Sequence, residues 1–329
     1  MNILFLEPND KGLYYSEFAS ALKQKCSVFQ YGPGFQYYNS NHTIEDILPL
    51  MEKKPDLILF GFGWENDVHQ EEYSFHSADL KIKDLDIQKA FIINKEYKKL
   101  EQKLSFIRDN DIDICFTVLH TAKDFGTQGS KPFFMRHLQI YQMPFAANKT
   151  IFKDYHLPKT IDVGFSGNMF TTPVYKDTGI MGNYFQNIRE RIHNELQGAP
   201  YKDLETWWNT NTGSFLYGRD YSKLINSTKI WLNTPSAADI VGTRFYEVIA
   251  SNTLLFCREC PWAYKSIGLI DGETCVTFKS DLSDFQEKLF YYLDSTLERQ
   301  KIVENAYELF INNHTWEHRV DFLISKCTN

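Results

Sequence analysis

Short apolar runs alternate with amphipathic stretches along the chain, and this alternation restricts the fold more than any other feature of the sequence. In the first half, runs typical of buried strands are separated by stretches with apolar residues at helical spacing. The strand-like runs are Asn2–Glu7, Cys26–Gly32, Asp56–Gly63, Lys89–Asn94 and Asp113–His120. Strands that alternate with helices form parallel sheets covered by helices on both faces. The first half is therefore predicted to be a doubly wound α/β domain.

The alternation stops near residues 144–159 and then begins again. Strand-like runs at 162–168, 228–234, 254–257 and 275–279 are interleaved with helical stretches, and three helical stretches follow from Asp281 to the end. The sequence therefore predicts two successive Rossmann-like α/β domains. We expect an N-terminal domain over 1–148, a linker over 149–161 and a second domain over 162–312. A last helix is expected over 313–329.

The composition and charge of the chain argue against some classes of protein. The 329 residues carry a formal net charge of −7, which argues against a protein that mainly binds nucleic acid through phosphates. No stretch approaches the ~18 apolar residues of a membrane helix, and the first residues lack the pattern of a signal peptide. The six cysteines are scattered, as expected for buried free thiols. We expect a cytoplasmic protein with no membrane span.

The stretch from Ser236 to Cys257 carries the strongest chemical signal. Gly242 and Thr243 stand just before a predicted helix, and Thr243 is expected to be its N-cap. Free N–H groups at a helix N-terminus bind anions. Arg244 would add a charged donor for phosphate, and Glu247 could accept hydrogen bonds from the two hydroxyls of a ribose. The alternative is an Arg244–Glu247 ion pair on a solvated helix face.

The residues from Tyr217 to Phe322 resemble the C-terminal nucleotide-sugar domain of GT-B glycosyltransferases, and are most similar to the CgeB/YkvP type. The resemblance rests on YGRDYSKLINSTKIWLNT, DIVGTRFYEVIASNTLLF, DGETCVTFKSDLSDFQEKLFYYL and NNHTWEHRVDFLI. Related transferases have two Glu separated by seven residues, and here Asp239 and Glu247 keep that spacing. The resemblance implies that Glu247 binds the donor ribose and that the helix N-terminus takes the pyrophosphate. It also implies that the last helix, over 313–329, packs back on the first domain.

One departure from that pattern concerns the phosphates. Related retaining enzymes often supply an Arg and a Lys from the loop after the first strand of this domain, whereas Ser166–Pro173 has no basic residue. Arg219 and Arg244 are then the expected phosphate partners, and the backbone of Tyr217, Gly218 and Arg219 could recognise the base. Retention and inversion both stay open.

Three residues of the first domain are candidates for a catalytic base. His120 ends a predicted strand, where ligands of parallel sheets bind, and an imidazole there could deprotonate an acceptor hydroxyl. Glu7 and Glu65 follow two other predicted strands. Each of the three is also explained by a local hydrogen bond to the backbone.

Three other motifs fit a functional site, but each is also explained by core packing or by chance spacing. His314 and His318 fit the pattern H-x-x-E-H and would lie on one helix face, but too few residues follow for a third zinc ligand. Cys257 and Cys260 have C-x-x-C spacing without a second such pair. The tryptophans of ETWWNTNTG, expected on a helix, could stack on a sugar or fill a core.

The sequence thus predicts a metal-independent GT-B glycosyltransferase without a resident cofactor. Its co-substrate would be a nucleoside-diphosphate sugar such as a UDP-sugar, and its acceptor a glycan or another hydroxyl compound. No D-x-D pair stands in a suitable strand-end loop, which favours metal independence. The alternatives are a non-catalytic sugar-nucleotide-binding protein on the same fold and a zinc-dependent hydrolase.

Overall fold

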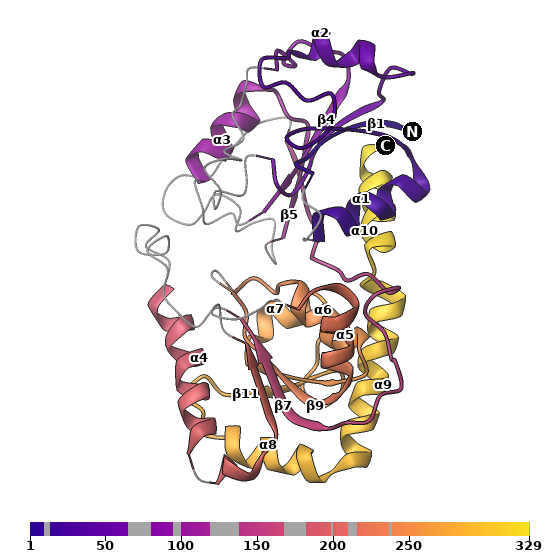
Figure 1. Cartoon of the computed structure of the whole chain (residues 1–329). Helices are drawn as coiled ribbons and strands as arrows, with labels where there is room; N and C mark the ends of the chain where they lie inside the picture. The colour runs from indigo at the N-terminus through magenta and orange to yellow at the C-terminus, as the bar shows by residue number, and fades with distance from the viewer. Residues whose placement is uncertain are drawn as a thin grey trace. The chain divides into compact units, whose positions relative to one another are not determined.

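The computed structural model of the chain has two compact units (Figure 1). It describes residues 1–9, 14–64, 80–94, 100–118, 138–167, 182–198, 200–209, 216–236 and 239–328. Unit 1 consists of Met1–Pro144 together with Trp316–Asn329, and unit 2 of Phe145–Thr315. Each unit is described by itself below.

Unit 1 is built on a six-stranded parallel sheet in the order β2-β1-β3-β4-β5-β6. The strands are β1 (Asn2–Leu6), β2 (Ser27–Tyr31), β3 (Leu57–Phe60), β4 (Gln88–Ile93), β5 (Ile114–Thr117) and β6 (Gln139–Gln142). The helices are α1 (Tyr14–Lys25), α2 (Ile44–Ile47), the 3₁₀ turn η1 (Leu48–Leu50), α3 (Leu100–Asp109) and α10 (Trp316–Cys327). The five predicted strands are confirmed, and β6 is an additional one.

Alternate residues of each strand of this sheet face opposite layers. Leu4 and Leu6 join a core cluster with residues of α2 and α3. On the other face, Phe5 contacts Phe18 of α1, with ring centroids 6.0 Å apart. The α10 helix packs beside α1 on that face, where the Trp316 ring lies 5.9 Å from Phe18. The sheet is therefore covered on both sides, as a doubly wound domain requires.

Unit 2 repeats this architecture on a five-stranded parallel sheet in the order β11-β10-β9-β7-β8. The strands are β7 (Ile161–Ser166), β8 (Thr206–Asn209), β9 (Thr228–Asn233), β10 (Leu254–Arg258) and β11 (Val276–Phe278). The helices are α4 (Gly182–Gln197), η4 (Tyr201–Asp203), α5 (Gly218–Asn226), α6 (Thr243–Ala250), α7 (Pro261–Lys265), α8 (Phe285–Asp294) and α9 (Thr296–Asn313). Two doubly wound α/β domains are therefore confirmed.

The two tryptophans expected on a helix lie in strand β8 instead. Trp208 stacks on Phe165 at 4.3 Å, whereas Trp207 contacts Trp231 at 5.6 Å. Adjacent side chains of a strand point to opposite faces, so one tryptophan enters each layer of the unit. Neighbouring side chains on a strand can pack in both layers of the unit. The packing of the two tryptophans therefore favours a strand over a helix at residues 206–209.

The H-x-x-E-H pattern does not lie on one helix. His314 is the C-cap of α9, and α10 begins at Trp316. The His314 ring is buried and its Nε2 is hydrogen-bonded to the carbonyl of Ile267 at 2.8 Å. The expected common helix face is therefore wrong, and His314 is a packed histidine that anchors the end of α9.

The cysteines are free thiols, as the sequence predicted. All six cysteines are free, and five of them are buried. Burial, followed by the nearby charge of Asp239, raises the pKa of Cys260 to about 12. None of the helices in the described ranges combines the length and apolarity that a membrane crossing needs.

Candidate functional site

The carboxyl ends of β7 and β9 meet at one edge of the unit 2 sheet, the edge at which parallel α/β sheets bind ligands. Ser166 ends β7 and is followed by Gly167. Asn233 ends β9, and the chain then turns into the loop that leads to α6. This loop is tied back on itself, because the amide of Ser236 donates to the carbonyl of Ile240 at 2.9 Å.

No side chain of the described residues caps the N-terminus of α6. Gly242 is the N-cap in an extended conformation, and Thr243 is the first helical residue, so the expectation that Thr243 is the N-cap is wrong. The structure gives this N-cap no side-chain hydrogen bond, and a Cβ built on Gly242 would meet no described atom within 4 Å. Intrahelical bonding leaves the first N–H groups of a helix to other acceptors, and an anion can take that place at α6.

Arg244 is held at this edge by a tyrosine. Its Nε donates to the hydroxyl of Tyr221 at 3.1 Å, and the same hydroxyl lies 2.6 Å from Ser166 Oγ. Tyr221 is buried in α5, where its ring contacts Phe152 and Trp231 edge-on. The contact is possible because α5 and α6 lie on the same face of the sheet as Trp231.

A second arginine, which the sequence did not single out, joins Arg244. Arg189 of α4 donates through Nε to Thr234 Oγ1 at 2.7 Å. A Cβ built on Gly167 would lie 3.4 Å from Arg189 Nη1 and 3.5 Å from Arg244 Nη1. The two guanidinium groups thus converge on the side of Gly167 where any other residue would carry its side chain. The helical pattern of residues 183–198 indicates a helix, but not that Arg189 faces the strand ends.

Arg244 and Glu247 do not form the ion pair considered from the sequence. Among the described residues, no ion pair joins their side chains. Burial raises the pKa of Glu247, against the opposing influence of Arg244 and of a hydrogen bond with Thr243. Burial alone would lower the pKa of Arg244, but Tyr221 and Glu247 outweigh it and the pKa is raised. Arg244 therefore stays cationic while its guanidinium points to Tyr221 and Gly167.

Asp239 has a structural partner. Its carboxylate pairs with Arg258, whose side chain is 7% exposed at the end of β10. Asp239 adopts a left-handed backbone conformation, with φ 53°, which an aspartate tolerates better than most residues. The ion pair fixes the loop before α6 to the neighbouring strand.

The residues at the start of α5 are more exposed. Tyr217 is the N-cap of α5 and is 62% exposed, and Gly218 has φ 55°. A Cβ on Gly218 would meet no described atom within 4 Å. Arg219 is exposed in the first turn. Arg189 converges with Arg244 at Gly167, and Arg219 as a phosphate partner stays a prediction.

Of the three base candidates in unit 1, only Glu7 lies within the described residues; Glu65 and His120 lie outside them. Glu7 is 1% exposed, and its Oε1 accepts the amide of Gly63 at 2.9 Å. A Cβ on Gly61 would come within 1.6 Å of Glu7 Oε2. The carboxylate therefore fastens the end of β1 to the glycine turn after β3, beside a cavity of about 150 Å³ lined in part by Pro8 and Asn9.

Comparison with protein families bears on unit 2. Residues 182–325 match a family model described as glycosyl transferase-like. The match includes Arg189, Tyr221, Arg244 and Glu247, and it spans less than half of the chain. No curated protein matches the chain in sequence.

Solved structures resemble the whole chain. A glycosyltransferase from Rickettsia africae ESF-5 has a TM-score of 0.64 and 12% identity, over 99% of this chain and 97% of that chain. The E. coli structure described as trehalose-6-phosphate bound with UDP-2-fluoro glucose has a TM-score of 0.64 and 10% identity, over 99% of each chain. Anabaena Alr3699/HepE in complex with UDP-glucose has a TM-score of 0.60 and 9% identity, over 99% of this chain and 100% of that chain. The chain therefore has the GT-B fold that the sequence predicted.

Proposed function

We propose that the chain is a glycosyltransferase that moves a sugar from a nucleoside-diphosphate sugar to an acceptor hydroxyl. The observation that carries this proposal is the convergence of Arg189 and Arg244 beside Gly167, next to the N-terminus of α6, which no described side chain caps. Two guanidinium groups and a helix N-terminus suit a diphosphate. The glycosyl transferase-like match over the same segment supports a sugar nucleotide as its source.

In this mechanism the acceptor oxygen forms a bond to the anomeric carbon, and the bond from that carbon to the diphosphate oxygen breaks. The nucleoside diphosphate leaves with the bonding electrons. Arg189, Arg244 and the first N–H groups of α6 would stabilise the charge that develops there, which is usually the largest contribution to catalysis. Because these donors are cationic or dipolar, they could do so without a metal ion.

Glu247 would bind the ribose of the donor. It lies one turn after Arg244 on α6 and makes no ion pair with it among the described residues. A carboxylate can accept hydrogen bonds from two vicinal hydroxyls. The backbone at Tyr217–Arg219 is the proposed contact for the base, and His120, Glu7 or Glu65 would take the acceptor proton.

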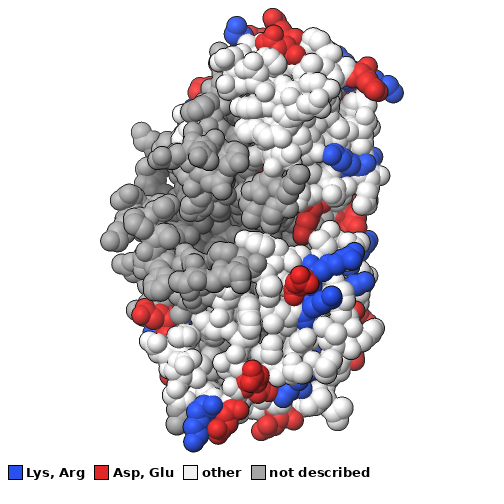
Figure 2. Space-filling view, in the orientation of Figure 1, with Lys and Arg blue, Asp and Glu red and all other residues white. Residues whose placement is uncertain are grey.

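The donor is proposed to be a UDP-sugar, because two of the similar structures hold UDP-2-fluoro glucose or UDP-glucose. We further propose a CgeB/YkvP-like transferase of hexosyl type that acts in the cytoplasm on a glycan or another hydroxyl acceptor. Charges of both signs are interspersed on the described part of the face in Figure 2, which does not resemble a nucleic-acid-binding surface.

Calorimetric titration with UDP and with uridine tests the assignment. Arg244→Ala should weaken UDP binding by about 100-fold and leave uridine binding nearly unchanged, because charge-assisted bonds to phosphate are lost. Glu247→Gln should weaken both ligands by a similar factor of about tenfold, because the ribose is common to them. Glu195→Gln, an exposed glutamate of α4, is the control and should bind as the wild type does.

A donor panel separates the possible functions. Wild-type protein that binds none of UDP, GDP and TDP would contradict the proposal. Binding without release of the nucleoside diphosphate from any UDP-sugar, with water or with acceptor, would instead indicate a non-catalytic sugar-nucleotide-binding protein.

A further inference from the structure

Tyr221 stands between the two groups that end at the proposed phosphate position. Its hydroxyl is the common partner of Arg244 Nε at 3.1 Å and of Ser166 Oγ at 2.6 Å. The three residues come from α6, α5 and the end of β7. No feature of the sequence indicated that they meet, because this depends on how both helices pack on the sheet.

The donors and acceptors of this trio fix the direction of one of its two hydrogen bonds. An arginine Nε–H can only donate, so the Tyr221 oxygen accepts that bond. Between the Tyr221 hydroxyl and Ser166 Oγ, 2.6 Å apart, either oxygen can be the donor. When Tyr221 donates, the Ser166 oxygen is satisfied as an acceptor and its own proton is left for another group.

Packing makes Tyr221 a rigid support. Its ring contacts Phe152 at 6.3 Å and Trp231 at 5.8 Å, both edge-on. Tyr221 is 8% exposed, so water competes little for its hydroxyl. The guanidinium of Arg244 is consequently held with Nη1 near Gly167, close to Nη1 of Arg189.

We propose that Tyr221 is the positioning residue of this site: it orients Arg244 toward the diphosphate and leaves the Ser166 hydroxyl proton to bind the same anion. This inference rests on the proposed function and adds a phosphate contact, Ser166, and a support, Tyr221. Tyr221 does not itself touch the ligand.

The test is Tyr221→Phe, which keeps the ring and removes only the hydroxyl. UDP affinity, measured calorimetrically, should fall about tenfold while uridine affinity stays within twofold, because only the phosphate contacts are loosened. A purely structural role would weaken both ligands alike. Ser166→Ala should weaken UDP several-fold, again without changing uridine binding.

A matched control is Tyr201→Phe. Tyr201 is 1% exposed in the same unit, and its hydroxyl has no hydrogen-bond partner among the described residues. This variant should bind UDP as the wild type does. If Tyr221→Phe binds UDP normally while Arg244→Ala does not, the positioning role is wrong and the proposed function stands. If Ser166→Ala alone is normal, the Ser166 contact is wrong. If wild-type protein binds no diphosphate, both proposals fall together.

Discussion

At the residue scale, three glycines of unit 2 allow close contacts that a side chain would prevent or leave space that a side chain would fill. Gly167 leaves room between two guanidinium groups, and a Cβ on Gly242, the N-cap of α6, would meet no described atom within 4 Å. Gly164, in the middle of β7, makes room for a buried ring. A Cβ there would lie 2.5 Å from a ring carbon of Trp231, so the indole of Trp231 packs directly on the strand backbone.

Gly164→Ala should therefore destabilise the protein. Real Cβ atoms do not approach ring carbons so closely, and Trp231 is fully buried, so the ring must move within a close-packed layer. We expect the free energy of unfolding to fall by about 1–3 kcal/mol, measured by urea denaturation. Gly198→Ala is the control, because a Cβ there meets only the carbonyl of Glu195 at 3.4 Å. Equal stability of the two variants would contradict the packing argument.

The sequence indicated some residues of the site and could not indicate others. Gly242 and Arg244 were predicted because they are close in sequence, within one loop and the helix after it, and the ribose role of Glu247 stays a prediction. Arg189 and Tyr221 were missed because their roles depend on which face of α4 and of α5 points to the strand ends. The sequence predicted Thr243 as the N-cap of α6, whereas the structure has Gly242. A shift of one residue leaves the sequence pattern unchanged.

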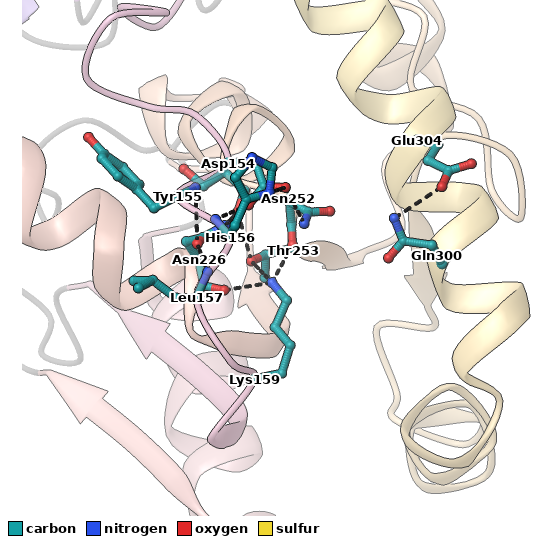
Figure 3. Close-up of polar contacts among 11 residues, drawn as sticks. Asp154, Tyr155, His156, Leu157, Lys159, Asn226, Asn252, Thr253, Gln300 and Glu304 are labelled. Carbon is teal, nitrogen blue, oxygen red and sulfur yellow. Dashed lines mark hydrogen bonds and ion pairs between the residues drawn. The ribbon is translucent and has the colours of Figure 1, made fainter.

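At the scale of elements, the segment that enters unit 2 is anchored by polar contacts. Figure 3 shows Asp154 directed at Asn226 and Asn252, with which it is hydrogen-bonded at 3.0 and 2.9 Å. Asn226 ends α5 and Asn252 lies in the turn after α6. Lys159 donates to the carbonyls of Asn226 and Asn252 and to Thr253 Oγ1. Residues 154–159 thus follow the surface of unit 2 in a defined path.

Lys159 gives this anchor a pH dependence. Burial, the largest cause, lowers the pKa of Lys159 to about 8 from its ordinary 10.5. Between these values the unfolded chain binds more protons than the folded chain, so stability rises with pH. The stability contributed by Lys159 should be lowest below pH 8 and should increase by about 1–3 kcal/mol toward pH 10.

Lys159→Met removes this dependence. The difference in the free energy of unfolding between wild type and variant, measured by denaturant titration from pH 7 to pH 10, should grow with pH. Titrations of other groups cancel in the difference. Lys153→Met, an exposed lysine of the same segment, should give a flat difference. A flat difference for Lys159→Met as well would contradict the linkage.

At the scale of the whole molecule, the order of elements was predictable because each unit repeats one pattern of strand and helix. The strand β8 was not, since four residues carry too short a signal to be told from a helix. The strand β6 was missed for the same reason. The return of the chain to unit 1 at Trp316 was expected only from resemblance, because a helix does not reveal in its sequence which sheet it covers.

Unit 1 combines Met1–Pro144 with the last residues from Trp316 on, and Trp316 packs against aromatic rings of the first part. Its ring is 1% exposed and lies 5.8 to 6.2 Å from the rings of Tyr14, Phe18 and Phe62. Its Nε1 donates to Glu17 at 2.9 Å. Trp316 is therefore the main contact by which α10 closes the layer that begins with α1.

Trp316→Ala should destabilise unit 1 selectively. Removing a buried tryptophan costs about 3–5 kcal/mol, and the loss should fall on the unit that buries it. Hydrogen exchange measured by mass spectrometry should show faster exchange in β1 and α1, while β9 and β10 of unit 2 keep their protection. Trp262→Ala, at a tryptophan 51% exposed on α7, is the control and should leave unit 1 unchanged. Equal loss of protection in both units after Trp316→Ala would mean that the two units unfold together rather than as separate cores.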